Sequence, residues 1–286
     1  MRLTFSGHET FQCRHLWLKK GYDYVKKGKS FSADDAVIEL GVGKNMVTSI
    51  RFWLRAFGLL DMGDQLTEFA QKMFEDDGWD PFLEDEASLW LLHYNLVKKN
   101  YATLYNGVFN ELRKEKLEFT KDHFLNYIKY KYSYLSDFRH TQNTIESDFG
   151  VFTKMYVGDP ESKDKEDIIT GIMTELGLVR SISKGIYSIE SSERKEIPNS
   201  VILYAIVDSQ DYGVSINFRT LLSDVNSPGS IFAINESGLY AKIESIAQDY
   251  SDLIVFKDDA GVRELQFKDA KPNPFKILND YYDHED

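Results

Sequence analysis

The stretch from Lys44 to Arg55 carries cationic, amide and hydroxyl side chains at a helical spacing. On a helix of about 3.6 residues per turn these side chains share one face, and the apolar residues of the stretch fall on the other. Lysine and arginine neutralise phosphates, while amides and hydroxyls hydrogen-bond base edges or backbone oxygens. The pattern therefore predicts a DNA-contacting helix with six candidate residues, Lys44, Asn45, Thr48, Ser49, Arg51 and Arg55. The other interpretation is a protein-contact helix whose charges are only solvated.

A second polar cluster lies in residues 5–14 and contains His8, Glu9, Thr10 and Arg14. A His–Glu pair is suited to general-base catalysis or to metal ligation. Residues 3–11 are aromatic and β-prone, however, and neighbours on a strand point to opposite faces. On a strand one of the pair would thus face away from a shared site. His8 and Glu9 are the candidate catalytic residues, and Thr10 and Arg14 complete the motif. The alternative is a structural knot that holds the N-terminal strand against the helices.

Other reactive-looking residues fit structural roles better. Glu161, Ser162 and Lys163 match the end of a nuclease signature, but they lie in a charged loop and indicate a solvated linker. His93 lies in an apolar run and is expected at the edge of a core, while His140 follows an arginine and could reach a phosphate. The single cysteine, Cys13, excludes an internal disulfide and a multi-cysteine zinc site. We expect no resident metal, and a divalent ion such as Mg²⁺ only if the protein nicks DNA.

The elements that position these residues form a predicted helix-turn-helix over residues 32–61. A short helix ends at Leu40, a turn spans Gly41 to Gly43, and a second helix continues to Phe57 with its apolar face inward. Residues 59–66 then predict two short strands around a glycine turn, which is the wing of a winged helix. Four flanking cations would hold phosphates on either side: Arg2, Lys26, Lys27 and Lys29.

The rest of the chain predicts more helices and further hairpins. Residues 86–156 indicate a helical body, including a helix over 121–134. A charged loop follows at 156–167 and marks a domain boundary. Beyond it we expect helices over 167–176, 215–222 and 236–249, with hairpins at 177–189 and 253–267, whereas 201–208 fits a helix or a buried strand. The fold class is α+β, predominantly α-helical, with winged helix-turn-helix-like units joined by a helical middle region.

Three domains follow from this organisation. Residues 1–80 form an N-terminal winged-helix DNA-binding region, residues 81–158 a helical middle domain, and residues 159–286 an acidic C-terminal domain with winged-helix-like units. Their charges differ in sign: the net charge is +5 over residues 1–60, −9 over 61–91, +4 over 92–140 and −12 over 141–286. Positive potential is confined to the N-terminal half, which suits DNA on one face and a protein partner on another.

The sequence lacks an apolar signal segment and any apolar run long enough to cross a membrane. We therefore expect a cytoplasmic protein with no membrane partner.

Five segments together resemble a known bacterial family: 5–11 with Arg14, 40–53, 80–85, 89–93 and 227–232. This SspB-like family, once known only as a domain of unknown function, belongs to DNA phosphorothioation systems found in defence islands. The resemblance implies a role in replacing a non-bridging phosphate oxygen by sulfur, a DNA-nicking activity, and partners that resemble a phosphoadenosine-phosphosulfate (PAPS) reductase and an ATPase. The motif positions that carry over are His8, Glu9, Thr10, Arg14, Lys44, Asn45 and Arg51.

The basic helix predicts binding to double-stranded DNA. Together with the resemblance it implies the DNA-binding component of a bacterial phosphorothioation or anti-phage defence complex, with nickase activity if His8 and Glu9 are catalytic. The alternative is a non-enzymatic winged-helix transcription regulator or assembly adaptor.

Overall fold

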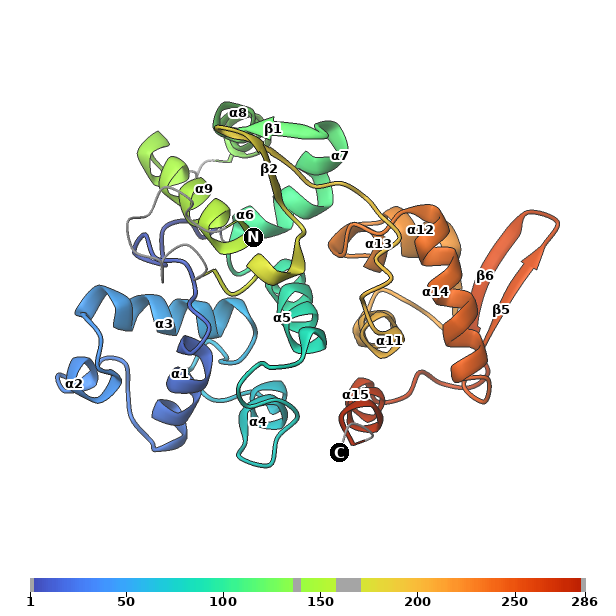
Figure 1. Ribbon diagram of the computed structural model, residues 1–286, viewed down its shortest axis with the longest axis horizontal. Coiled ribbons are helices and arrows are strands. Elements are labelled where there is room, and N and C mark those ends of the chain that lie inside the picture. The colour runs from blue at the N-terminus through green and yellow to red at the C-terminus, as the bar shows by residue number, and fades with distance from the viewer. Residues whose placement is uncertain (1–2, 136–139, 158–170, 284–286) are drawn as a thin grey trace. The chain divides into compact units, whose positions relative to one another are not determined.

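A computed structural model describes residues 3–135, 140–157 and 171–283 (Figure 1). Backbone contacts divide the chain into two compact units, residues 1–189 and 190–286. The structure is predominantly helical with two small antiparallel sheets, as the sequence predicts. No helix of the described ranges is both long and apolar enough to cross a membrane.

Unit 1 begins with three helices that follow one another closely along the chain. The helices α1 (Trp17–Lys26), α2 (Ala36–Leu40) and α3 (Lys44–Ala56) contact one another in pairs. Gly41 ends α2 with a positive φ of 61°, a conformation that glycine adopts without a steric penalty. Gly21 of α1 allows a close approach, because a Cβ there would lie 2.6 Å from Leu54 and 2.8 Å from Ile50 on α3.

The predicted wing is a tight turn with a single bridge. Leu60 pairs with Leu66, and the Asp61 N–H donates to the Gln65 carbonyl at 3.0 Å. The Asp61 carboxylate accepts the N–H groups of Gly63 and Gln65 and holds the turn closed. Helix α4 (Glu68–Phe74) follows, and the Thr67 hydroxyl caps it as predicted, accepting from the Ala70 N–H at 3.2 Å.

The centre of unit 1 is helix α5 (Glu86–Lys99), in which every residue from Ala87 to Val97 is buried. Such a helix needs apolar neighbours on all sides. The remaining helices of the unit are α6 (Thr103–Gly107), a π-helical turn (Val108–Leu112), α7 (Arg113–Glu115), α8 (Lys121–Tyr132), α9 (Gln142–Tyr156) and a 3₁₀ turn (Thr174–Leu176). An aromatic cluster including Phe109, Phe152 and Tyr156 packs against His93.

The predicted boundary near residue 158 falls inside unit 1. The hairpin β2 (Arg180–Ser183) and β3 (Ile186–Ser188) is present, but its second strand also pairs with β1 (Glu118–Thr120) from the middle of the chain. This pairing joins residues 180–188 to the region before the charged loop and moves the boundary to residue 189. The segment Glu161–Lys163 and the first four residues of the predicted helix 167–176 lie outside the described residues. The rest of that predicted helix, residues 171–176, forms a turn and the 3₁₀ turn Thr174–Leu176.

Unit 2 contains α11 (Asn199–Asp208), β4 (Ser215–Asn217), α12 (Phe218–Ser223), α13 (Pro228–Ile231), α14 (Glu236–Asp249), β5 (Ile254–Asp259), β6 (Val262–Phe267) and α15 (Pro274–Tyr282). The predicted hairpin and the helix at 236–249 are confirmed, and 201–208 is helical. The predicted helix 215–222 begins instead with a short strand, because β4 pairs with β6. Both sheets have the same strand order: the third strand lies between the first and the second.

Candidate nucleic-acid interface

The N-terminal half of α3 presents a polar face to solvent. Lys44, Asn45 and Thr48 are exposed, while Val47, Ile50 and Trp53 on the other side of the helix are buried. The side chains of Lys44 and Asn45 make no ion pair or hydrogen bond with the described residues. The Thr48 hydroxyl lies 3.5 Å from the Lys44 carbonyl, which leaves it able to bond elsewhere. These three side chains are thus exposed and able to bind a ligand, as a DNA-contacting face requires, and their contact with DNA stays a prediction.

Ser49 does not belong to this face. Its side chain is fully buried, and its hydroxyl lies 3.5 Å from the carbonyl oxygen of Phe11. The same carbonyl accepts a hydrogen bond from Trp53 Nε1 at 3.0 Å. The predicted DNA contact of Ser49 is therefore wrong, because the segment before α1 covers that part of the helix.

The two predicted arginines, Arg51 and Arg55, are bound by the turn that follows α3. Arg51 Nε and Arg55 Nε each donate to Asp64 Oδ1 at 3.0 Å, and Arg55 Nη2 also donates to the Met62 carbonyl at 2.9 Å. The hydrogen bond to Asp64 raises the pKa of Arg51 above its ordinary value. Asp64 thus neutralises positive charge that the sequence assigns to DNA.

Within the described residues, some of the flanking lysines are paired with carboxylates and one is not. Lys26 pairs with Glu75, and this hydrogen bond raises the pKa of the lysine. Lys29 lies 3.5 Å from the carboxylates of Asp35 and Glu39, whose charge also raises its pKa. Lys27 is exposed and has no ion pair within the described ranges, and Arg2 lies outside them. Of these cations, Lys27 is the one with an unpaired charge on the surface.

The motif loop, residues 6–11, lies against α3 as a series of turns and not as the predicted strand. His8 is 2% exposed, and its Nε2 lies 3.1 Å from Asp148 Oδ1 on α9. Its ring stacks on Trp53 at 5.7 Å and meets Phe52 edge-on. The ring is buried and held by Asp148 and two aromatic rings, which fits the structural alternative for His8 better than the catalytic one.

The loop presents its next two residues to solvent. Glu9 and Thr10 are exposed and have positive φ angles of 49° and 70°, which non-glycine residues rarely adopt. Nothing in the described structure pairs Glu9 with His8, so the predicted catalytic pair is not assembled. Arg14 lies over the Trp17 ring at 5.7 Å and is part of the packing of α1. Backbone strain of this kind is maintained by the contacts on either side of it.

Metal-ligating groups are not concentrated in one place. In the described ranges, no group of three or more histidine, cysteine, aspartate or glutamate residues lies together. His93 is buried as expected and bonds the Tyr156 hydroxyl through Nδ1 at 2.7 Å. His140 packs edge-on against Phe5 at 4.8 Å.

A comparison with known protein families identifies the family of this chain. A family described as a protein of unknown function, DUF4007, matches residues 5–282. The chain belongs to the DUF4007 family. A search of the curated proteins found no match.

The DUF4007 chain is also similar to two solved structures. One is described as "SspB crystal structure" and is 30% identical, with a TM-score of 0.87, over 99% of this chain and 88% of the other. The other is described as "Magnesium ion-bound SspB crystal structure" and is 29% identical, with the same TM-score and coverage. The resemblance to an SspB-like family is therefore confirmed, and it extends through both units.

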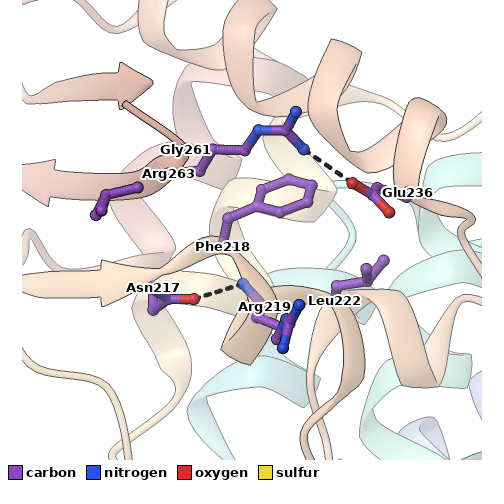
Figure 2. Close-up of a pocket in the computed structure, with 8 residues that line it drawn as sticks. Asn217, Phe218, Arg219, Leu222, Glu236, Gly261 and Arg263 are labelled. Carbon is purple, nitrogen blue, oxygen red and sulfur yellow. Dashed lines mark hydrogen bonds and ion pairs between the residues drawn. The ribbon is translucent and has the colours of Figure 1, made fainter. Parts of the chain in front are cut away.

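A pocket in unit 2 of the DUF4007 chain has a different chemistry (Figure 2). Arg263 Nη1 pairs with Glu236 at 2.8 Å and its Nε with Asp258 at 3.1 Å, while its guanidinium lies over the Phe218 and Tyr240 rings. The lining residues are Asn217, Phe218, Arg219, Leu222, Glu236, Gly261, Val262 and Arg263. Since two carboxylates satisfy Arg263, the residue joins the hairpin to the start of α14 and does not offer a free cation.

Two residues of the DUF4007 chain that shape the interface were not predicted, Asp64 and Asp148. Asp148 lies on α9 beside the buried Phe149 and is itself only 5% exposed. A carboxylate on an apolar helix face needs a partner, and this signal was available in the sequence. Asp64 gave no such signal, because acidic residues are common in surface turns.

Proposed function

We propose that this chain is the DNA-binding component of a bacterial DNA phosphorothioation system. Its double-stranded DNA site consists of Lys44, Asn45 and Thr48 on α3, beside the motif loop. The observation that supports the site best is the solvent-exposed, unpaired state of the Lys44 and Asn45 side chains. The phosphorothioation role comes from the SspB-like structures, which match nearly the whole chain.

Each residue of the site has a distinct role in this proposal. Lys44, at the start of α3, pairs with a phosphate, and the partial positive charge of the helix N-terminus adds to the attraction. Asn45 and Thr48 are three positions apart on the exposed side of the helix, and they hydrogen-bond base edges or backbone oxygens. Lys27 supplies a further phosphate contact, and the half-exposed Arg51 remains within reach of the duplex edge.

The motif loop orients the site in this proposal. The contact between His8 and Asp148 is reinforced by the Ser6 N–H, which donates to the same Asp148 oxygen at 2.7 Å. Both bonds fix the loop against α3 and leave Glu9 and Thr10 facing solvent. His8 is thereby a positioning residue, and Glu9 is the one predicted catalytic group that a phosphodiester can approach.

If the protein nicks DNA, Glu9 would act together with a bound divalent metal ion. One of the similar structures is described as bound to magnesium, and Mg²⁺ in proteins is commonly held by one or two carboxylates together with phosphates and water. Glu9 fits such a ligand set, because its exposed carboxylate has no partner in the described structure. A bound ion would polarise the scissile phosphate. The protein's own contribution is to hold the strand on α3 next to Glu9.

The acidic C-terminal region, residues 190–286, has a net charge of −9, from 9 basic and 18 acidic residues. A surface of this charge repels the phosphates of DNA and is therefore available for proteins. We assign the region to recruitment of the PAPS-reductase-like and ATPase proteins of the system. The strand order β4–β6–β5, with helices between β4 and β5, supports the expectation of a winged-helix-like unit in this region. The β1–α8–α9–β2–β3 region of unit 1 has the same strand order.

A non-enzymatic winged-helix regulator or assembly adaptor is the second candidate. The observation that favours it is the pairing of Arg51 and Arg55 with Asp64 and of Lys26 with Glu75, which reduces the positive charge facing DNA. In that case the same helix face binds a protein.

The two candidates are separated by one pair of assays. Supercoiled plasmid is incubated with the protein and Mg²⁺ or Mn²⁺, and binding to a fluorescent duplex is measured without metal. We expect duplex binding that Lys44→Glu weakens and Lys116→Glu, a change of the same charge at an exposed lysine of unit 1, does not. Nicking that Glu9→Ala abolishes supports the enzyme, and binding without nicking supports the reader. Duplex binding that Lys44→Glu leaves intact refutes the site.

A further inference from the structure

Helix α8 and the turn that follows it expose two tyrosines that no part of the proposed duplex site uses. Tyr130 is 89% exposed and Tyr134 is 78% exposed, although both are large, partly apolar side chains. They are four positions apart, so they lie on one side of the helix and its C-terminal turn. The opposite face of α8 is buried through Phe124 and Ile128. The exposed tyrosines are therefore not required for packing of the helix.

The same exposed face carries positive charge and hydrogen-bonding groups. Lys129 precedes Tyr130 and forms no ion pair with the residues that the structure describes, whereas Lys131 is held by Glu111. Asn126 lies one turn before Tyr130 and is exposed. Lysine contacts phosphates, and an amide can pair with the edge of an unpaired base.

An open groove of about 520 Å³ borders this face, between α8 and the start of α9. Its lining residues are Asp122, Leu125, Asn126, Lys129, His140, Gln142 and Ile145. The groove connects to the motif loop in two ways. His140 packs against Phe5, and Asp148, three residues after the groove residue Ile145 on α9, holds Ser6 and His8. A strand that leaves the motif loop can thus continue toward α8 over neighbouring residues.

We propose that Tyr130, Tyr134 and Lys129 form a binding site for single-stranded DNA. The two rings provide stacking surfaces for successive bases, Lys129 neutralises a phosphate, and the groove takes one base edge next to Asn126. Stacking on aromatic side chains is the usual way in which proteins hold unpaired strands without reading their sequence. The site rests on the proposed DNA function, in which a nicked or opened duplex yields an unpaired strand.

The test is binding of a fluorescent oligothymidylate of about 15 nucleotides to the full chain, measured by anisotropy. The Tyr130→Ala/Tyr134→Ala variant is compared with Tyr130→Phe/Tyr134→Phe, which keeps both rings. We expect the alanine variant to bind the oligomer at least about tenfold more weakly and the phenylalanine variant to bind it nearly as well as the wild type. Both variants keep the wild-type thermal midpoint, because neither ring is buried.

Two controls identify the contact. An abasic oligomer of the same length retains the phosphates, so the alanine substitutions must leave its binding unchanged. Both tyrosine variants must also bind a duplex as tightly as the wild type does. Lys44→Glu should weaken binding to the duplex and leave binding to the oligothymidylate unchanged. Duplex binding that is absent in the wild type, or that Lys44→Glu leaves intact, therefore contradicts the proposed function. Oligothymidylate binding that the alanine substitutions leave intact contradicts the α8 site. Equal binding of the oligothymidylate by wild type and alanine variant, or an equal loss on the abasic oligomer, overturns the proposal.

Discussion

His8 and Asp148 are joined by a contact of 3.1 Å between Nε2 and Oδ1, although they come from the N-terminal loop and from α9. Both side chains are nearly buried, at 2% and 5% exposure. The contact ties together three parts of unit 1, because the His8 ring also stacks on Trp53 of α3. It sets the position of the motif loop relative to the proposed DNA face.

Breaking this contact should destabilise the protein. Asp148→Ala removes the acceptor of both His8 and the Ser6 N–H, and leaving buried donors unpaired costs about 1–3 kcal/mol. We expect a loss of this size in the free energy of urea unfolding. Glu9→Ala is the matched control in the same loop and should change it by less than about 0.5 kcal/mol, because Glu9 is exposed. Equal effects of the two substitutions would show that the buried pair contributes nothing.

Removing the Asp64 carboxylate should strengthen DNA binding. Asp64→Ala frees the guanidinium groups of Arg51 and Arg55, which then face the same side as Lys44. Each additional phosphate contact steepens the salt dependence, so the slope of log K against log salt should grow by about 1–2. Glu68→Ala removes one exposed negative charge close by without releasing an arginine. If Glu68→Ala increases affinity as much as Asp64→Ala, the gain comes from net charge and not from the arginines.

The motif loop needs glycine at position 7 for lack of space. A Cβ on Gly7 would lie 2.5 Å from Phe52 Cδ2, so Gly7→Ala must displace the phenylalanine ring. Overpacking of this kind typically costs about 1–3 kcal/mol, and we expect that loss in the free energy of unfolding. Gly150→Ala is the comparison, because no atom lies within 4 Å of its Cβ position in α9. It should stabilise the protein by about 0.5–1 kcal/mol, and destabilisation by Gly150→Ala would contradict the open space beside this position.

Lowering the pH should remove the contribution of the Lys26–Glu75 pair to the stability of the fold. The hydrogen bond from Lys26 holds the pKa of Glu75 below its ordinary value of 4.5. A carboxyl group whose pKa is lower in the folded state stabilises the fold above its unfolded pKa, and this stabilisation is lost as the pH falls through the folded pKa. The difference in thermal midpoint between wild type and Glu75→Gln should therefore shrink as the pH falls below 4.5. Lys26→Gln should show the same trend, and a difference independent of pH would contradict the pairing.

Periodicity and capping predicted the long elements well. Helix α14 begins and ends where the amphipathic pattern does, and the Thr67 cap of α4 is as expected. The strand β1 was missed because it contains three residues, and short strands are fixed by their partners more than by their own sequence. The predicted strand at 3–11 failed because His8 and Trp53 hold the loop in left-handed turns that local propensity does not encode.

In the candidate site, the sequence predicted the positions of only those side chains that are exposed to solvent. The helical spacing correctly predicted that Lys44, Asn45 and Thr48 lie on the exposed face of α3. The same arithmetic failed for Ser49, since the segment that covers it is distant in sequence. The pairing of Arg51 and Arg55 with Asp64 depends on the exact turn after α3, and that geometry cannot be read from composition.

The central claim is that the N-terminal half of α3 binds duplex DNA through Lys44. Its most direct test is the salt dependence of duplex binding by wild type, Lys44→Gln and Lys116→Gln. Loss of one phosphate contact lowers the magnitude of the slope of log K against log salt by about 1. We predict this decrease for Lys44→Gln and a wild-type slope for Lys116→Gln. Identical slopes for wild type and Lys44→Gln would contradict the claim.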